Sequence, residues 1–296
     1  MTTAALAGTL QRVIPWSERR VLLQWATAAI AFAILYGGPI AKLARDWWVE
    51  PDAGHGLLLA PLALYLAWKR GVRADARGQR ILGSVLLGIA VIMRYVGGLA
   101  AELFTMRASL VLGIFGLIIF YLGARQILHW WLPLSLFVLA VPLPVVVLSS
   151  IAFPLQLKAS QMGAALLEWR QIPVMLNGNV IHLPGRTLFV TEACSGLRSL
   201  ASLLSLGVLI GGLWLKWPIM RMLLVLLAIP VAMMLNGVRV FLTGFLVYFV
   251  DPALGEGFMH MTEGWIIFVV AFLILGAIAW LLVQVENLRR PHQVEE

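Results

Sequence analysis

The sequence contains little charge for its length. Only 12% of its 296 residues are charged and 61% are hydrophobic, whereas an ordinary globular domain has about 25% charged residues. A water-soluble protein of this size would leave too much apolar surface exposed. The scarcity of charge therefore excludes a cytosolic enzyme, a nucleic-acid-binding domain and a secreted disulfide scaffold, and it predicts that most of the chain lies in lipid.

Cysteine is almost absent, since Cys194 is the single one. A lone cysteine excludes an intrachain disulfide and a cysteine metal cluster. The sequence also lacks the His-Glu-x-x-His motif of zinc proteases and a glycine-rich phosphate loop, so we expect neither a metal nor a cofactor. A cleavable signal peptide is not expected either, because the first 20 residues carry four charges and lead into a full spanning segment.

Long low-charge runs predict an all-α polytopic membrane protein with about eight transmembrane helices, because a helix needs about 20 apolar residues to cross the hydrocarbon core. Within a few residues, the expected spans are 21–39, 55–68, 81–99, 108–123, 128–148, 194–214, 220–242 and 264–284. Apolar and polar residues alternate over 149–169, which favours an interfacial amphipathic helix over a ninth span. Residues 179–183 and 186–190 flank a Pro184-Gly185 turn and predict a small β-hairpin.

The distribution of positive charge orients these spans. With the N-terminus inside, thirteen Lys and Arg residues lie in cytoplasmic segments and six lie outside; Arg94, Arg198 and Arg239 fall in or at the edge of predicted helices. This asymmetry places both termini in the cytoplasm. We expect one domain over 1–296, with a cytoplasmic N-terminus at 1–20, a periplasmic interfacial segment and hairpin at 149–193, and a cytoplasmic tail at 285–296. The net charge of +8 then reflects topology, and no nucleic acid is expected as a partner.

Cys194 lies where the predicted hairpin enters the sixth span, on the outer side. Thr191 is a suitable N-cap, which would put Cys194 in the first turn of the helix. The helix dipole and Arg198, one turn later on the same face, would both favour a thiolate, as a nucleophilic cysteine requires. The alternative is a small buried apolar cysteine, with Arg198 extending to the lipid headgroups.

Two further polar residues reach the same outer side. Arg239 interrupts the seventh span near its outer end, and His260 stands at the outer entrance to the eighth. Taken alone, Arg239 could extend to the interface and His260 could be a solvated loop residue. Together with Cys194, however, they supply the thiolate, cation and base that acyl transfer requires. His55 also faces outward and could line the same cavity, but we favour a role only at the start of the second helix.

The segments Thr191 to Arg198, Asn236 to Arg239 and His260 to Gly264 closely resemble the exosortase branch of the exosortase/archaeosortase family. Further similarity covers most of the chain, from about residue 45 to 270, and includes the segments 54–56, 65–68, 142–144, 153–157 and 178–184. Archaeal relatives carry arginine at the position of His260, so the histidine here indicates the bacterial branch. The Gly54-His55-Gly56 segment lacks the tyrosine and serine of the family pattern, and His55 is left out of the catalytic set.

This resemblance implies a multi-pass transpeptidase or peptidase of the bacterial inner membrane with its site facing the periplasm. Such enzymes are expected to cleave a C-terminal PEP-CTERM sorting signal on exported proteins and to transfer those proteins to an acceptor, in organisms that make extracellular polysaccharide. Cys194 matches the nucleophile that forms the acyl-thioester, Arg239 the essential arginine and His260 the third catalytic residue. Arg198 matches a motif residue, which we assign to support of the thiolate or oxyanion.

Two other classes remain open from the sequence. A transporter or channel could use Arg198, Arg239 and His260 as a polar path, with Cys194 incidental. The chain could also be a non-catalytic membrane partner of a polysaccharide machine. The residues are compatible both with transfer to an acceptor and with hydrolysis.

Overall fold

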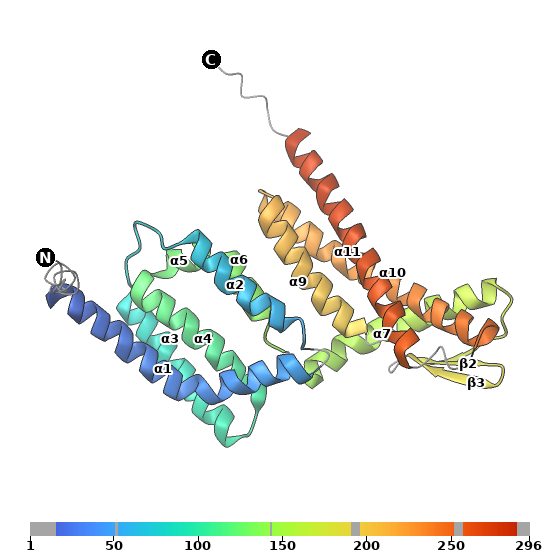
Figure 1. Ribbon diagram of the computed structural model, residues 1–296, viewed down its shortest axis with the longest axis horizontal. Helices are drawn as coiled ribbons and strands as arrows, with labels where there is room; N and C mark the ends of the chain where they lie inside the picture. The colour runs from blue at the N-terminus through green and yellow to red at the C-terminus, as the bar shows by residue number, and fades with distance from the viewer. Residues whose placement is uncertain (1–15, 51–52, 143, 191–195, 252–256, 289–296) are drawn as a thin grey trace, which may run out of the picture. The chain divides into compact units, whose positions relative to one another are not determined.

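The computed structural model describes residues 16–50, 53–142, 144–190, 196–251 and 257–288, and it is mostly helical with one small sheet (Figure 1). The elements are α1 (Trp16–Val49), α2 (Gly56–Arg70), α3 (Arg80–Leu99), α4 (Leu103–Leu122), α5 (Ala124–His129), α6 (Trp131–Leu139), α7 (Val145–Trp169), β1 (Met175–Asn177), β2 (Val180–Leu183), β3 (Arg186–Phe189), α9 (Gly196–Trp214), α10 (Pro218–Phe249) and α11 (Gly257–Leu288). The helical fold class predicted from the sequence is confirmed.

Among the residues that the structure describes, five helices are long and apolar enough to cross a membrane: α1 from Leu23, α3, α4, α10, and α11 from Trp265. They correspond to the predicted spans 21–39, 81–99, 108–123, 220–242 and 264–284. The predicted spans 55–68 and 194–214 correspond to α2, which has 15 residues, and to α9, which has 19. The structure therefore supports a multi-pass protein with five candidate spans, and the count of eight stays a prediction.

The predicted span at 128–148 is wrong as a single helix. The structure divides this stretch into the end of α5, α6, a connection that contains Pro142 and Pro144, and the start of α7. Pro133 explains the first break, because it has no N–H and its ring excludes the helical bond to the carbonyl of His129. That carbonyl instead accepts a hydrogen bond of 3.0 Å from Nη1 of Arg70, which ties the break to the end of α2.

The predicted interfacial helix at 149–169 is the larger part of α7, which begins earlier, at Val145, and packs along α10. A Cβ atom at Gly163 would lie 2.3 Å from Cγ1 of Val240, and one at Gly237 would lie 2.9 Å from Cβ of Met162. Such close approach requires glycine on both helices. α7 is not among the five candidate spans, and one of its faces is buried by protein.

The hairpin predicted at 179–190 is confirmed, and it belongs to a three-stranded antiparallel sheet in the order β1-β2-β3. Leu183 pairs with Arg186 across the two-residue turn, where Gly185 has a φ of +77°, a conformation open to glycine at no steric cost. The first strand was not predicted. Its three residues, Met175 to Asn177, carry no β-branched side chain that would indicate a strand.

The backbone separates into two units, Met1–Arg45 and Asp46–Glu296. Most of α1 forms the first unit. Its helix begins at Trp16, within the segment predicted as a cytoplasmic N-terminus, and α11 extends to Leu288, into the predicted tail at 285–296. The single-domain assignment over 1–296 and the cytoplasmic location of both ends stay predictions.

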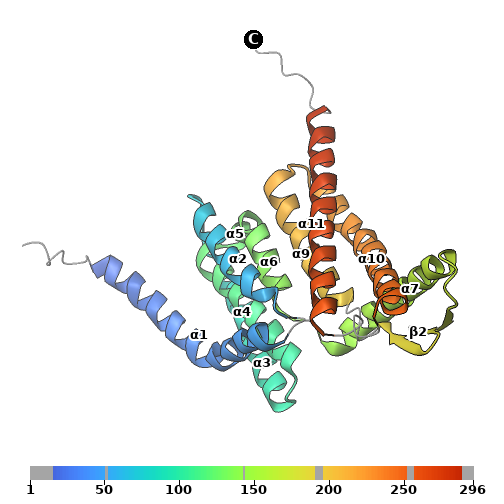
Figure 2. The same cartoon turned by 45° about the vertical axis from the view of Figure 1, so that its right-hand side comes forward.

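Within the second unit, α3 and α4 form an antiparallel hairpin, and α9, α10 and α11 pack side by side (Figures 1 and 2). The α3–α4 contact depends on glycine, since a Cβ at Gly83 would lie 2.5 Å from Cα of Phe120. Small residues allow membrane helices to approach closely in this way. The contact between α9, α10 and α11 is centred on a buried cluster that includes Leu203, Leu224 and Leu275.

Candidate functional site

The four predicted site residues lie on three helices and on the segment that precedes one of them. Cys194 lies outside the described residues. Arg198 is the third residue of α9 and His260 the fourth of α11; the side chains of both lie outside the described part of the structure. Arg239 is described in full, in the second half of α10.

Arg239 lies on a polar face of α10. Its side chain is half-buried and its Nε atom is buried. Asn236 and Thr243 are 6% and 2% exposed, and their spacing of three and four residues from Arg239 puts all three on one side of the helix. The Thr243 hydroxyl donates a hydrogen bond of 3.0 Å to the carbonyl oxygen of Arg239. The polar face is therefore held inside protein.

The α7 helix packs beside this polar segment of α10. Gly237, between Asn236 and Arg239, contacts Met162 of α7, and Val240 contacts Gly163. Further along both helices, a Cβ at Gly244 would lie 2.8 Å from Cδ1 of Leu167. The contacts advance in the same direction on the two helices, so α7 follows α10 past Arg239 in parallel.

The sheet covers the same end of α10. Ile181, Leu183 and Val190 share a buried cluster with Val240 and Val247 of α10. Val190 is fixed further by its N–H, which donates a hydrogen bond of 3.0 Å to the carbonyl of Asn179. The last described residue before the cysteine-containing segment therefore belongs to the same buried cluster as Val240, the residue that follows Arg239.

The opposite ends of α9, α10 and α11 meet at Glu286. This carboxylate, 2% exposed, accepts hydrogen bonds from the backbone N–H groups of Lys216 at 3.0 Å and Trp217 at 2.8 Å, directly before α10. An acidic side chain at a helix N-terminus satisfies free N–H groups and interacts favourably with the helix dipole. The end of α11 is thus joined to the start of α10, close to where α9 ends.

From that common end, the rise of about 1.5 Å per residue gives the height of each predicted site residue along its helix. Arg239 follows Pro218 by 21 residues, or about 32 Å; His260 precedes Glu286 by 26, or about 39 Å; and Arg198 precedes Trp214 by 16, or about 24 Å. The three lie within about 15 Å in height, at the end away from Glu286.

The three described histidines have structural partners. Nε2 of His55 lies 3.1 Å from the carbonyl oxygen of Leu139, next to the Trp47 indole that donates to Ala140 at 2.7 Å. His129 contacts the carbonyl of Arg70 at 3.2 Å, and His182 the hydroxyl of Thr187 at 3.2 Å. Among the described residues, no group of three His, Cys, Asp or Glu side chains could hold a metal ion.

Two features of this arrangement were not predicted from the sequence. The pairing of Glu286 with Lys216 and Trp217 joins residues about 70 positions apart, and no local pattern indicates it. The helix contact at Gly237 and Gly244 could have been found, because glycines seven residues apart lie on one face of a helix and indicate close packing.

Comparison with known families identifies the chain. Residues 47–277 match the family model described as Transmembrane exosortase (Exosortase_EpsH). No curated protein and no solved structure matches the chain significantly. The match covers more than three quarters of the sequence, including α2 to α10 and the positions of Cys194, Arg239 and His260. The chain belongs to the transmembrane exosortase family.

Proposed function

We propose that this protein is a cysteine-dependent transpeptidase or peptidase that cleaves the C-terminal PEP-CTERM-type signal of exported proteins. Cys194 is the nucleophile, Arg239 the essential cation and His260 the third catalytic residue, with Arg198 in a supporting role. The site faces the periplasm from the bacterial inner membrane. The observation that carries the proposal is Arg239 itself, a cation held with its Nε atom buried near the end of a membrane helix.

The depth of Arg239 suits chemistry at the membrane surface. Starting from Pro218, about 32 Å of helix reaches Arg239, which is close to the hydrocarbon thickness of about 30 Å. An arginine at the centre of a spanning helix would cost about 2.5–3.5 kcal/mol on insertion scales. This depth, together with the buried Asn236 and Thr243 on the same side of the helix, supports a functional role for the Arg239 cation at the outer edge of the bilayer.

Chain connectivity supports a short distance between the thiol and this cation. Val190 packs in one cluster with Val240, and Cys194 follows Val190 by four residues, a Cα separation of at most about 14 Å. The described part of α9 begins two residues later, at Gly196, so the positive end of its dipole lies next to the cysteine in sequence. A helix N-terminus and a nearby arginine both favour a thiolate.

The proposed reaction has two steps. The Cys194 thiolate attacks the carbonyl carbon of the scissile peptide, Arg239 stabilises the oxyanion, and the leaving amine takes a proton with His260 as its acid-base partner. The C–N bond breaks and an acyl-thioester remains on Cys194. An acceptor amine then attacks the thioester and restores the thiol, whereas attack by water gives hydrolysis. The substrate helix and its basic tail would cross the bilayer in the orientation favoured by the positive-inside rule.

Co-expression with an exported protein that carries the C-terminal signal tests the proposal. Cys194→Ser and Arg239→Gln should abolish or strongly reduce processing on immunoblots, since loss of one oxyanion donor costs about 10²–10³ in rate. His260→Ala should cost about 10²–10⁴. The matched controls are Arg94→Lys, which alters a cation in α3, and His129→Ala, which alters a histidine in α5; both should process normally.

Unchanged processing by Cys194→Ser at equal protein level would refute the thiol mechanism. A covalent adduct of a thiol-reactive substrate mimic on any residue other than Cys194 would refute the nucleophile assignment. Because the chain has a single cysteine, a membrane-impermeant maleimide reports on Cys194 alone, and labelling from the periplasmic side is expected. Loss of transport of a solute in the Arg239→Gln variant, with processing intact, would instead favour the channel or transporter alternative.

A further inference from the structure

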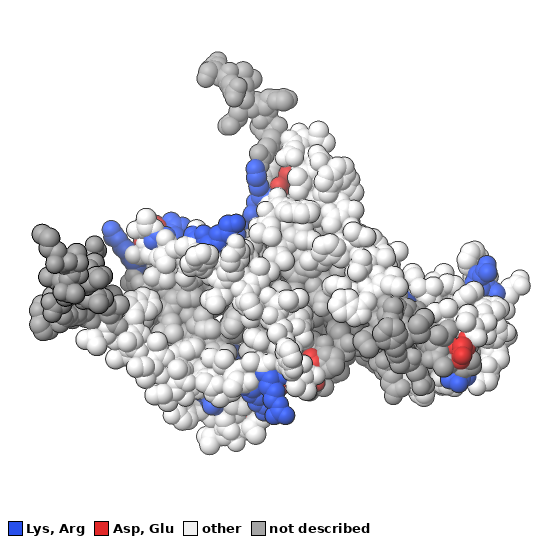
Figure 3. Space-filling view, viewed as in Figure 1, with Lys and Arg blue, Asp and Glu red and all other residues white. Residues whose placement is uncertain are grey.

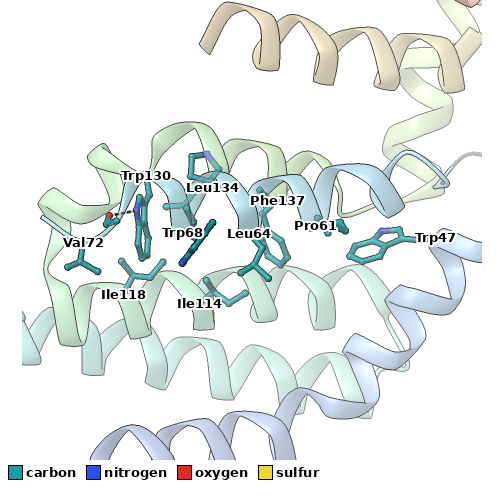
Figure 4. Close-up of a pocket in the computed structure, with 15 residues that line it drawn as sticks. Trp47, Pro61, Leu64, Trp68, Val72, Ile114, Ile118, Trp130, Leu134 and Phe137 are labelled. Carbon is teal, nitrogen blue, oxygen red and sulfur yellow. Dashed lines mark hydrogen bonds between the residues drawn. The ribbon is translucent and has the colours of Figure 1, made fainter. Parts of the chain in front are cut away.

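An apolar groove of about 840 Å³ lies between α2, α4 and α6, away from the polar face of α10. Figure 4 shows Leu64 and Trp68 of α2 projecting into it from one side and Ile114 and Ile118 of α4 from another. The side chains of Leu64 and Trp68 are 74% and 78% exposed. In a membrane protein, exposed apolar side chains of this kind are available to contact lipid tails, which are as apolar as leucine.

The length of the groove corresponds to one leaflet of a bilayer. Its lining follows α2 from Ala60 and continues to Gly71 and Val72, beyond the end of the helix at Arg70. From Ala60 to Arg70 the helix rises about 15 Å, and half of the hydrocarbon core is about 15 Å. Trp47, whose indole donates to the carbonyl of Ala140, lies at one end in Figure 4, and Trp130, whose indole donates to the carbonyl of Gly71 at 2.9 Å, lies at the other.

The volume of the groove favours a lipid chain over a protein helix. A spanning helix about 10 Å wide and about 30 Å long displaces roughly 2,400 Å³, nearly three times the volume of the groove. A lipid methylene occupies about as much space as a water molecule in the liquid, roughly 30 Å³, so a chain of about 18 carbons needs roughly 540 Å³. One acyl chain fits inside the groove.

Positive charge surrounds one end of this groove. Between Lys69 and Arg80, five cations and one acid, Asp75, occur, and Figure 3 shows blue atoms along this edge of the molecule. Asp75 is already paired, with Arg73 at 2.8 Å and with Arg125 at 3.7 Å. Lys69 and Arg77 are exposed, so the end of the groove at Gly71 and Val72 carries a surplus of positive charge.

One more cation, Arg221, lies near this end, beside Arg70. The guanidinium carbons of Arg70 and Arg221 lie 5.9 Å and 4.8 Å from the centre of the Trp131 ring. No described acidic residue forms an ion pair with either arginine within 4 Å. Like charges held on one ring repel each other, and an anion placed between the helix ends would relieve the repulsion.

We propose that this groove binds an anionic phospholipid, with an acyl chain between α2, α4 and α6 and the phosphate at the basic end near Gly71. Burial of an acyl chain against protein gains little over burial in the bilayer, because lipid tails are as apolar as leucine. Selectivity must therefore come from the headgroup, and basic pockets between membrane helices recognise anionic headgroups. This site is independent of the thiol chemistry proposed above.

Native mass spectrometry of the full-length protein in mild detergent tests the proposal, with phosphatidylglycerol and phosphatidylcholine of identical chains as probes. Each surface cation contributes about fivefold to anionic lipid affinity, so phosphatidylglycerol should bind about 25-fold more tightly or better. The double variant Lys69→Gln with Arg77→Gln should lower the ratio of phosphatidylglycerol affinity to phosphatidylcholine affinity about 25-fold. Lys158→Gln, which removes an exposed cation on α7, should leave this ratio unchanged. Glycerol 3-phosphate, which has the headgroup chemistry but no chain, should not bind measurably.

Variants that fill the groove complete the test. Ala67→Phe and Leu64→Trp should each lower phosphatidylglycerol affinity at least fivefold, and the exposed position of Leu64 makes the second variant safe for folding. Ile81→Phe, which enlarges an exposed residue of α3 outside the groove, is the control. Equal binding of the two lipids, or unchanged affinity in both filled variants, would overturn the proposal. Photo-crosslinking of a substrate helix to Leu64 in place of lipid would overturn it in favour of a protein ligand.

Discussion

Replacement of Glu286 tests how the structure holds its candidate site. This carboxylate is the contact that joins the end of α11 to the start of α10, and the heights of Arg239 and His260 both depend on that junction. Glu286→Ala removes the acceptor of two backbone N–H groups. Glu286→Gln keeps one carbonyl oxygen of nearly the same shape but removes the negative charge. Neither change touches a predicted catalytic residue.

The expected magnitude follows from the two hydrogen bonds. A buried donor left without its partner costs about 1–3 kcal/mol, so Glu286→Ala should lower the free energy of unfolding by about 2–6 kcal/mol. Glu286→Gln leaves one N–H satisfied and should lower it by about 1–3 kcal/mol. Because Glu286 is 2% exposed, solvent does not replace the lost acceptor.

Unfolding of the full chain in mixed micelles, titrated with SDS and followed by tryptophan fluorescence, measures these differences. The wild type should unfold at the highest SDS fraction, Glu286→Gln at a lower one and Glu286→Ala at the lowest. Glu168→Gln, at an exposed position near the end of α7, is the matched control and should change little. If Glu286→Ala unfolds at the same SDS fraction as wild type, the junction at Glu286 neither stabilises the fold nor fixes the heights of Arg239 and His260.

Three further predictions concern local packing and capping. Gly83→Ala should reduce the yield of folded protein in detergent, because the new Cβ would lie 2.5 Å from Cα of Phe120 and disrupt the α3–α4 contact. Gly88→Ala, with nothing within 4 Å, should be tolerated. Equal yields of the two variants would contradict the close packing of α3 and α4. Gly163→Ala should reduce substrate processing about tenfold or more by pushing α7 away from Val240, and Gly276→Ala, which meets nothing within 4 Å, should not; melting curves in detergent separate misfolding from a local effect. The pKa of Glu102, at the N-cap of α4, lies below its ordinary value of 4.5. The causes are the hydrogen bond with the Thr105 side chain and those with the backbone N–H groups of Thr105 and Phe104. The contribution of the ionised Glu102 to the free energy of unfolding is therefore complete above about pH 4.5 and is lost as the pH falls through the lowered pKa. The difference in melting temperature between wild type and Glu102→Gln should accordingly shrink on acidification from pH 7 to pH 3, and a constant difference would show that the cap does not act through its charge.

The long helices could be predicted because hydrophobic length is a property of the local sequence. The apolar runs that became α3, α4, α10 and α11 are long and contain few charged residues, and the structure extends α10 and α11 to 32 residues each. The error at 128–148 arose from counting apolar residues without weighing Pro133, Pro142 and Pro144. Each of these prolines removes a backbone donor, so hydrophobicity persists where a continuous helix does not.

In the sheet, too, the part set by local sequence could be predicted and the part set by distant contacts could not. The hairpin was predicted because Pro184 and Gly185 specify a turn between β-branched runs. The first strand forms because Met175 to Asn177 pair with Val180 to His182, and pairing of a short strand depends on its partner more than on its own composition. The apolar groove could not be predicted from local sequence, because its lining comes from α2, α4 and α6 and depends on how these helices pack.

Arg239 illustrates how the structure changes the weight of a hypothesis drawn from sequence. At the sequence level, an arginine near the end of a span is explained equally well by extension toward the lipid headgroups. The side chain of Arg239 is half-buried, its Nε atom is buried, and Asn236 and Thr243 on the same side of the helix are covered. The parallel contact of α7 through Gly163 and Met162 also fixes the backbone on either side of it. In the proposed reaction, a backbone held on both sides of Arg239 keeps this cation in place as negative charge develops, which favours electrostatic stabilisation of an oxyanion.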